Sequence, residues 1–224
     1  MRKVIASTFL SLDGVMQAPG GPSEDPTGGF RFGGWFTSYF DELLGQAVDK
    51  VMADPFDLLL GRKTYEIFAA HWPFIDPDAE YSEITRKFAA CRKYVAASPD
   101  QPLTWQNSVN LGSNPVSAVE RLKREDGPNL LIQGSGQFAQ ALLAADLIDE
   151  ITVMVAPVLL GRGKRLFGDS TAPSGFELVD HAVSTTGVTI GRYCRGGEIQ
   201  TGSFAMPEPS QAERDRQARW AREG

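Results

Sequence analysis

A strand, a glycine-rich turn and a helix in direct succession constrain this chain more than any other feature. The apolar run 129–133 (NLLIQ) predicts a strand, GSG interrupts it, and 137–147 has the apolar spacing of a helix. Gly134, Gly136 and Ala139 satisfy the pattern G-x-G-x-x-A. Glycine lets the backbone approach a pyrophosphate, and the following helix N-terminus offers free N–H groups and partial positive charge. The pattern alone is weak evidence, because glycine also ends strands for steric reasons.

The rest of the chain alternates between expected strands and expected helices. Before the GSG turn we expect strands at 2–10, 57–61 and 93–98, and helices at 35–52, 62–70, 80–90 and 115–125. After it come three β-rich segments at 149–160, 176–184 and 186–194. Alternating strands and helices that end in strands predict an α/β fold, with a mainly parallel sheet and an antiparallel C-terminal extension.

Two segments fit neither pattern. Residues 18–34 (APGGPSEDPTGGFRFGG) are too rich in Gly and Pro for a helix or strand, so they are either a functional loop, mobile until ligand binds, or a floppy surface loop. Residues 206–224 are charged and weakly apolar, which is typical of a tail outside the core. We therefore expect one domain over 1–204 and a charged tail over 205–224.

Composition excludes several classes of protein. The formal charge of −6, with no basic block outside the extreme C-terminus, disfavours a nucleic-acid partner. No run approaches the ~18 continuous apolar residues of a membrane span, and the N-terminus lacks the features of a signal peptide, so we expect a cytoplasmic protein. His71 and His181 are the only histidines and lie far apart, which argues against a histidine-rich metal site. Neither G-x-S-x-G nor a P-loop occurs.

A second turn carries positive charge. In LLLGRKTYE, Gly61 ends an expected strand, and Arg62, Lys63 and Thr64 begin the next helix. Cations in a first turn oppose the helix dipole, so a bound anion would explain them. A solvated surface face would explain them equally well.

A dinucleotide-binding Rossmann domain is a competing interpretation of the GSG turn. Asp149 and Glu150 follow it at about the distance of an acidic ribose contact. However, the turn comes late in the chain, and antiparallel-type strands follow it instead of another βαβ unit.

Five sequence blocks, in this order, resemble the dihydrofolate-reductase-like superfamily. They are SLDG (11–14), LLGRKTYE (59–66), KYVAAS (93–98), LLIQGSGQFAQALL (130–143) and LIDEITVMVAPVLLGRGKRLF (147–167). The chain is most similar to stand-alone proteins that resemble the C-terminal reductase domain of the bifunctional riboflavin-biosynthesis deaminase/reductase. The resemblance covers roughly residues 2–195. It implies a three-layer α/β/α fold, NADP(H) as cofactor and a homodimer.

The resemblance also implies a cofactor site. Its pyrophosphate part would consist of Gly134, Ser135, Gly136, Gln137 and Phe138. Its adenosine phosphate part would consist of Gly61, Arg62, Lys63, Thr64 and Ser98. In one respect the chain departs from its relatives, which commonly read S-R-T after the strand at 93–97, where this chain has Ala97-Ser98-Pro99. The missing arginine weakens the expected preference for NADP over NAD.

The expected substrate side follows the first strand. By resemblance it includes Ser11, Gly14, Met16 and Gln17, with 159–164, including Leu159, approaching from the strand-rich end. No proton donor is obvious. Asp13, which is typical of a turn, and Asp41 on the first long helix are the candidate catalytic carboxylates, and water is the alternative proton source.

These expectations combine into an NADPH-dependent reductase. It would transfer a hydride to a C=N or C=O carbon of a small heterocyclic or sugar-derived substrate, as a 5-amino-6-(5-phosphoribosylamino)uracil reductase does. The chain has no deaminase domain, which weakens that particular substrate. A folate or pteridine reductase and a non-catalytic nucleotide-binding protein are the alternatives.

Overall fold

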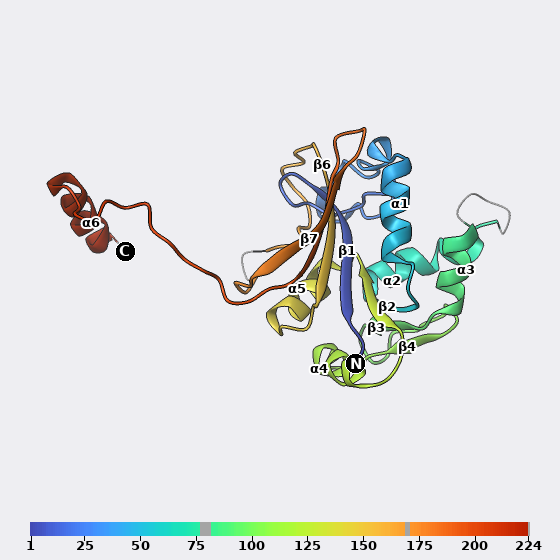
Figure 1. The fold of residues 1–224 in the computed structure, drawn as a ribbon. Coiled ribbons are helices and arrows are strands. Elements are labelled where there is room, and N and C mark those ends of the chain that lie inside the picture. The colour runs from blue at the N-terminus through green and yellow to red at the C-terminus, as the bar shows by residue number, and fades with distance from the viewer. Residues whose placement is uncertain (77–81, 169–170, 224) are drawn as a thin grey trace.

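A single sheet organises the chain in the computed structural model, which describes residues 1–76, 82–168 and 171–223. Its strands are β1 (Val4–Ser11), β2 (Phe56–Gly61), β3 (Lys93–Ala96), β4 (Ser108–Asn110), β5 (Asn129–Gln133), β6 (Glu150–Ala156), β7 (Phe176–Val183) and β8 (Thr189–Arg195). The order across the sheet is β4-β3-β2-β5-β1-β6-β8-β7 (Figure 1). The strands from β4 to β6 pair in parallel, and β8 and β7 extend the sheet antiparallel.

Helices cover both faces of the parallel part. Leu59 of β2 packs into a buried cluster with α4 (Pro115–Arg124) and α5 (Gly136–Ala144). Its neighbours Leu58 and Leu60 point to the opposite face and pack with α1 (Glu42–Val51), α2 (Arg62–Ala69) and α3 (Ser82–Ala90). Alternate side chains of a strand leave opposite faces of a sheet, so a continuous apolar run serves two cores. The three-layer α/β/α fold with a mainly parallel sheet and antiparallel C-terminal strands is confirmed.

The first long helix is shorter than the expected 35–52. Thr37–Tyr39 form a 3-10 turn, Asp41 is extended (φ −134°, ψ 180°), and α1 begins only at Glu42. The Asp41 carboxylate accepts a hydrogen bond from Leu44 N at 3.0 Å. An N-cap of this kind stabilises a helix start, so the chain turns at Asp41. Phe36, which the periodicity placed in the helix, instead stacks on Phe9 with ring centroids 4.1 Å apart.

Strand β4 was not expected from the sequence. Its three residues, Ser108–Asn110, show no apolar run, and none of them is buried. They become a strand because they pair in parallel with β3, where Tyr94 lies opposite Val109. Pairing with β3 in the tertiary structure therefore determines the extended conformation of this segment, and such context often outweighs local propensity in strands.

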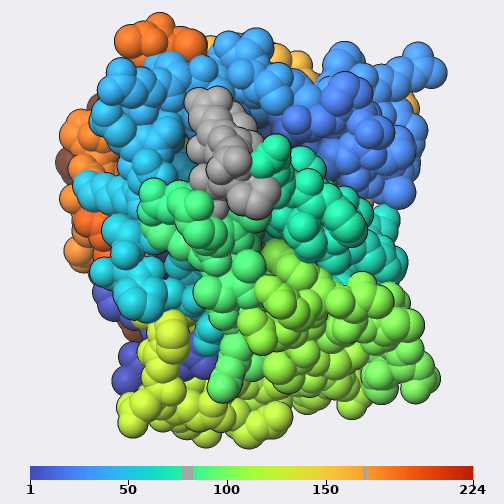
Figure 2. Space-filling view, turned by 90° about the vertical axis from the view of Figure 1, so that its right-hand side faces the viewer, coloured from blue at the N-terminus to red at the C-terminus, as the bar shows by residue number. Residues whose placement is uncertain are grey.

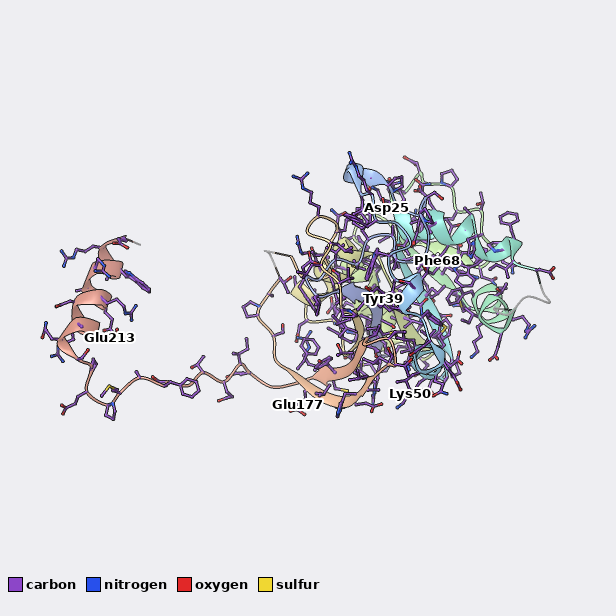
Figure 3. The ribbon with its side chains drawn as sticks, turned by 90° about the horizontal axis from the view of Figure 1, so that it is seen from above. Asp25, Tyr39, Lys50, Phe68, Glu177 and Glu213 are labelled. Carbon is purple, nitrogen blue, oxygen red and sulfur yellow. The ribbon has the colours of Figure 1, made fainter. Side chains whose placement is uncertain are left out.

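The C-terminal segment is helical at its end. Helix α6 (Gln211–Glu223) buries none of its residues, and Figures 1 and 3 show it at the end of an extended segment, away from the sheet. Phe204 and Met206 in that segment are exposed. The division into a domain over 1–204 and a tail over 205–224 stays a prediction. Within the described ranges, no helix is long and apolar enough to cross a membrane.

Figure 2 shows the face that α1, α2 and α3 cover. The Gly- and Pro-rich loop after β1 appears on this side in blue, above the teal helix α2. This arrangement places the loop beside the turn that ends β2, where the candidate site lies.

Candidate functional site

A cavity of about 1110 Å³ lies at the carboxyl ends of the parallel strands. The strand residues that line it are Ser7, Thr8 and Phe9 of β1, Gly61 of β2, Ala96 of β3 and Gln133 of β5. Parallel strands bring their carboxyl ends to one edge of the sheet, and the loops that follow them enclose a crevice there. The cavity therefore follows from the topology.

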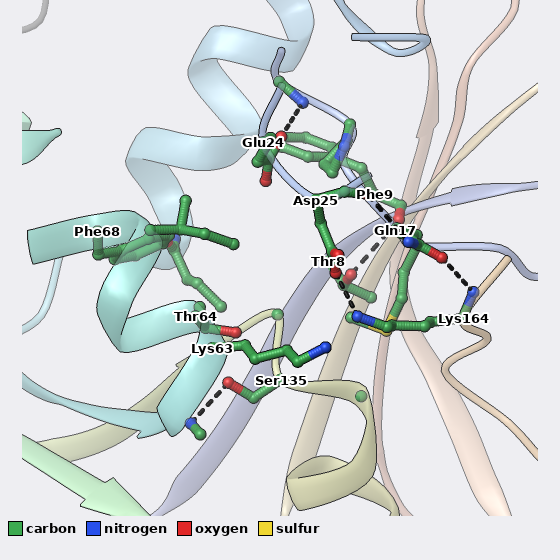
Figure 4. Close-up of a pocket in the computed structure, with 18 of the residues that line it drawn as sticks. Thr8, Phe9, Gln17, Glu24, Asp25, Lys63, Thr64, Phe68, Ser135 and Lys164 are labelled. Atoms are coloured by element: carbon green, nitrogen blue, oxygen red, sulfur yellow. Dashed lines mark hydrogen bonds and ion pairs between the residues drawn. The ribbon is translucent and has the colours of Figure 1, made fainter. Parts of the chain in front are cut away.

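The GSG turn and the turn after β2 contact each other at this edge. Gly134 and Ser135 both have positive φ, +83° and +64°. The Ser135 hydroxyl does not cap α5; its Oγ accepts a hydrogen bond from Gly61 N at 2.7 Å (Figure 4). A Cβ on Gly61 would lie 3.2 Å from Ser135 Cβ and Oγ, so this close approach favours glycine.

The start of α5 lines the cavity without a side-chain cap. Gly136, Gln137 and Phe138 form its first turn, and all three line the cavity. The first N–H groups of a helix have no partner within the helix and carry partial positive charge. This part of the cavity is suited to an anionic group such as a pyrophosphate.

The start of α2 adds cations. Arg62, Lys63 and Thr64 line the cavity, and the first turn of α2 contains no acidic residue. Arg62 Nη1 lies 2.8 Å from both carboxylate oxygens of Glu66, one turn along the same helix. Lys63 Nζ reaches across to Thr27 Oγ1 at 3.4 Å. Two cations at a helix N-terminus oppose the helix dipole, and an anion in the cavity would relieve that cost.

The loop 18–34 is folded against the cavity by a polar network. The buried Gln17 donates from Nε2 to the backbone oxygens of Asp25 and Thr27, both at 2.9 Å, and its Oε1 accepts from Lys164 N at 3.0 Å. Asp25 forms an ion pair with Lys164. Burial opposes ionisation of Asp25, but hydrogen bonds from Lys164 and Thr27 outweigh it and lower its pKa. That the loop is mobile without ligand stays a prediction.

Glu24 is a second carboxyl group of this loop that lines the cavity. Its Oε2 accepts hydrogen bonds from Gly20 N at 2.7 Å and Gly21 N at 3.2 Å. Burial nevertheless raises the pKa of Glu24, and the neighbouring charge of Asp25 acts in the same direction. A carboxyl group that retains its proton more readily than usual is a candidate acid.

Most sequence-predicted site residues share this one cavity. Those that line it are Met16, Gln17, Gly61, Arg62, Lys63, Thr64, Gly134, Ser135, Gly136, Gln137 and Phe138. Those that do not are Ser11, Asp13, Gly14, Asp41, Ser98 and Leu159. Leu159 is 72% exposed, and Ser98 engages Asn110 through its backbone oxygen. The roles assigned to all these residues stay predictions.

The two candidate catalytic carboxylates, Asp13 and Asp41, anchor loops by accepting hydrogen bonds. Asp13 Oδ1 accepts from Ser11 Oγ at 2.7 Å and Leu160 N at 3.0 Å, and Oδ2 accepts from Gly161 N at 2.8 Å. Partial burial opposes ionisation of Asp13, yet these hydrogen bonds outweigh it and lower its pKa from 3.8 to about 2. Asp41 caps α1 and accepts from Thr185 N and Oγ1. This geometry supports structural roles for both.

Sequence reasoning missed several lining residues. They come from β1, the loop 18–34, the connection before α1, helices α2 and α3, and the 3-10 turn Trp72–Phe74. They are Thr8, Phe9, Glu24, Asp25, Phe40, Phe68, Trp72 and Phe88. No spacing in the sequence joins them. The one available signal was the acidic pair Glu24–Asp25 inside an otherwise Gly- and Pro-rich segment.

Among the described residues, no group of three His, Cys, Asp or Glu side chains is placed to hold a metal ion. The polar groups that line the cavity are instead hydroxyls, amides, backbone N–H groups, two carboxyls and the cations of α2 and the 164–165 segment.

Solved structures share this fold. A putative riboflavin biosynthesis protein from Shewanella sp. PV-4 superposes with a TM-score of 0.60 at 21% identity, covering 87% of this chain and 99% of that chain. Dihydrofolate reductase from Enterococcus faecalis, complexed with NADP(H) and RAB-propyl, superposes with a TM-score of 0.54 at 15% identity. The match covers 87% of this chain and 97% of the reductase chain. The fold is therefore that of the dihydrofolate-reductase-like proteins.

Sequence comparison assigns the family. The RibD C-terminal domain family matches residues 2–190, and this chain belongs to that family. The uncharacterized protein YyaP of Bacillus subtilis (strain 168) is 25% identical over 192 residues, which cover 84% of this chain and 92% of YyaP. Family and fold together point to an oxidoreductase of the reductase type.

The Asp13 carboxylate provides a pH-dependent test of the loop anchor. We expect Asp13→Asn to lower the melting temperature at pH 7 by about 2–4 °C, corresponding to ~1 kcal/mol for a domain of this size. Because the folded-state pKa of Asp13 lies below its unfolded value, its contribution is present above pH 3.8 and is lost as the pH falls toward about 2. The gap between wild type and variant should narrow over that interval.

The exposed loop carboxylate Asp100 serves as the control, since Asp100→Asn should leave the melting temperature unchanged. Thermal unfolding followed by circular dichroism between pH 2.5 and 7 measures both variants. Equal melting temperatures of wild type and Asp13→Asn at pH 7 would refute the anchoring role.

Proposed function

We propose that this chain is an NADPH-dependent reductase that transfers a hydride to a C=N or C=O carbon of a small substrate. The observation that carries the proposal is the contact between the two strand–helix turns. Gly61 N and Ser135 Oγ are 2.7 Å apart, so the cationic start of α2 and the uncapped start of α5 line one cavity. A dinucleotide matches that arrangement if its pyrophosphate lies near the start of α5 and its adenosine phosphate near the start of α2.

The chain's residues fit the cofactor as follows. Gly134–Phe138 would hold the pyrophosphate, and Arg62, Lys63 and Thr64 would lie near the adenosine phosphate, as the sequence predicted. Ala96 and Pro115 line the cavity in the region proposed for the adenosine, whereas Ser98 does not. The bound cofactor would supply the hydride, while the protein orients both reactants and excludes water.

The substrate would occupy the cavity beside β1. Thr8, Met16 and Gln17 line this part together with the aromatic side chains. A small heterocycle fits such a lining, because ligand pockets combine apolar walls with a few polar groups. The uracil-type substrate of riboflavin biosynthesis is the specific candidate that family membership favours, and a folate or pteridine is the alternative that the fold favours.

We also propose that two copies associate through the antiparallel end of the sheet. Strand β7 is an edge strand, and its Leu178 and Val183 side chains are exposed. Apolar groups on an edge strand are usually covered. The acidic net charge of −6 argues against nucleic acid as the partner that covers them.

The GSG turn is the direct test of cofactor binding. A Cβ at Gly136 would lie 3.0 Å from Met16 Sδ and 3.3 Å from Arg165 O, so a valine side chain enters the space beside the α5 start. We expect Gly136→Val to weaken NADPH binding at least ~100-fold, or about 2.7 kcal/mol. Isothermal titration calorimetry measures the NADPH affinity, and circular dichroism verifies that the variant is folded.

Gly202→Val is the matched control, because a Cβ at Gly202 meets nothing within 4 Å and the residue lies in the C-terminal segment. Unchanged NADPH affinity in Gly136→Val would overturn the proposed cofactor site. Decay of nicotinamide absorbance with a panel of pteridines, imines and aldehydes separates a reductase from a protein that only binds nucleotides.

Cofactor selectivity tests the role of Arg62. A hydrogen bond to a charged group contributes about 1.5–3 kcal/mol, so one arginine contact should favour NADPH over NADH by roughly one to two orders of magnitude. We expect Arg62→Ala to erase most of that preference and to leave NADH affinity nearly unchanged. Competitive calorimetry with the two cofactors provides the measurement.

Arg124→Ala is the matched control for this test. Like Arg62, Arg124 forms an exposed i,i+4 ion pair with a glutamate, but it lies at the end of α4 and does not line the cavity. If wild type binds NADPH and NADH equally, Arg62 serves only its ion pair with Glu66, and the cofactor is NAD(P).

A further inference from the structure

The cavity has an aromatic side that the cofactor proposal does not use. Phe68 and Trp72 line it and pack on the fully buried Phe88, with ring centroids of Trp72 and Phe88 4.9 Å apart and of Phe68 and Phe88 5.8 Å apart. Phe9 and Phe40 also line the cavity, with ring centroids 6.5 Å apart. Planar apolar rings bind well to walls of this composition.

Glu24 lines the same cavity as these rings. Figure 4 shows it well separated from Ser135 and the start of α5. The charged groups that shift its pKa are Asp25, next to it in the loop, and His71, which immediately precedes Trp72. The carboxyl group therefore lies apart from the start of α5, and the residue whose charge acts on it from another element, His71, is next to Trp72 of the aromatic side.

The two carboxyl groups of the cavity have different partners. Asp25 forms an ion pair with Lys164 and accepts a hydrogen bond from Thr27 Oγ1. Within the described residues, both hydrogen bonds to Glu24 go to Oε2, from Gly20 N and Gly21 N, and Oε1 receives none. Backbone N–H groups thus fix the orientation of the Glu24 side chain and leave one oxygen available to a ligand.

Burial also keeps a proton on Glu24 more readily than on an ordinary glutamate, since it raises the pKa of this group. The charge of Asp25 adds to the effect and that of His71 reduces it. An acid with a raised pKa in a cavity that also has apolar walls is suited to give a proton to a weakly basic nitrogen.

We propose, resting on the reductase function above, that Glu24 binds and protonates the nitrogen of a cyclic imine whose ring system packs against the aromatic side of the cavity. The preferred substrate class is accordingly an unphosphorylated, apolar imine. The cofactor then occupies the parts of the cavity that are suited to anions, at the starts of α2 and α5.

The reaction balances as an imine reduction. The proton of Glu24 moves to the imine nitrogen, and the C=N carbon becomes electrophilic. A hydride from the reduced nicotinamide adds to that carbon, the C=N π bond breaks, and a secondary amine and the oxidised cofactor are formed. The Glu24 carboxylate then recovers a proton from water.

Two ligands of the same shape test the binding step. The probe is 1,2,3,4-tetrahydroisoquinoline, whose ring nitrogen is protonated at pH 7, and the control ligand is isochroman, which has oxygen in place of that nitrogen. Both are titrated by calorimetry into the full chain saturated with NADP⁺. In Glu24→Gln the amide oxygen still accepts from Gly20 N and Gly21 N, so the loop is retained while the charge is lost.

We expect Glu24→Gln to weaken binding of the amine at least ~10-fold and to leave isochroman binding unchanged. With 3,4-dihydroisoquinoline and NADPH, kcat should fall by about 10²-fold, the usual effect of losing a general acid. Glu42→Gln is the matched control, because Glu42 is an exposed carboxylate in the first turn of α1 outside the cavity.

The outcomes separate this proposal from the reductase proposal. If wild type binds NADP⁺ but binds the amine no more tightly than Glu24→Gln does, the role of Glu24 is overturned and the cofactor site stands. Absence of amine binding to the NADP⁺-loaded wild type also overturns it. If wild type does not bind NADP⁺, the proposed function fails, and the proposal built on it fails as well.

Discussion

The hydrogen bond from Gly61 N to Ser135 Oγ is the interaction on which the candidate site depends. Strands β2 and β5 are parallel neighbours, with Leu58 opposite Leu131 and Leu59 opposite Ile132, so both end at the same edge of the sheet. The absence of a side chain on Gly61 and the positive φ of Gly134, +83°, favour the close approach of the turns that follow. The starts of α2 and α5 are thereby brought to one cavity, and the proposed binding of an anionic cofactor rests on this arrangement.

The other side of the cavity depends on carboxylates that hold loops in place. Asp13 ties the turn after β1 to the 160–161 backbone, and Asp25 ties the Gly- and Pro-rich loop to Lys164. Buried Gln17 connects the same two segments through backbone groups. Because these acids are used for structure, Glu24 is left as the lining carboxyl group with an oxygen free of hydrogen bonds within the described residues.

Local sequence patterns predicted the parts of the site that lie on consecutive residues. The GSG turn and the Gly61–Thr64 turn are such parts, because a strand, a glycine and a helix start leave a short-range signal. The limits of α1 were wrong, since Asp41 caps the helix after Phe36 and Phe40, whose apolar spacing mimics a helical face. The Glu24 site was not predictable, because Phe68 and Trp72 come to line one cavity with the loop only through the tertiary fold.

The central claim is that a dinucleotide binds where α2 and α5 begin, and amide hydrogen exchange with and without NADPH tests it most directly. We expect slower exchange at Gly134–Phe138 and Arg62–Thr64 when NADPH is present, since their N–H groups would contact or be covered by the cofactor. Exchange in β7 and β8, at the far end of the sheet, should not change. Unchanged exchange at both helix starts under saturating NADPH would contradict the account.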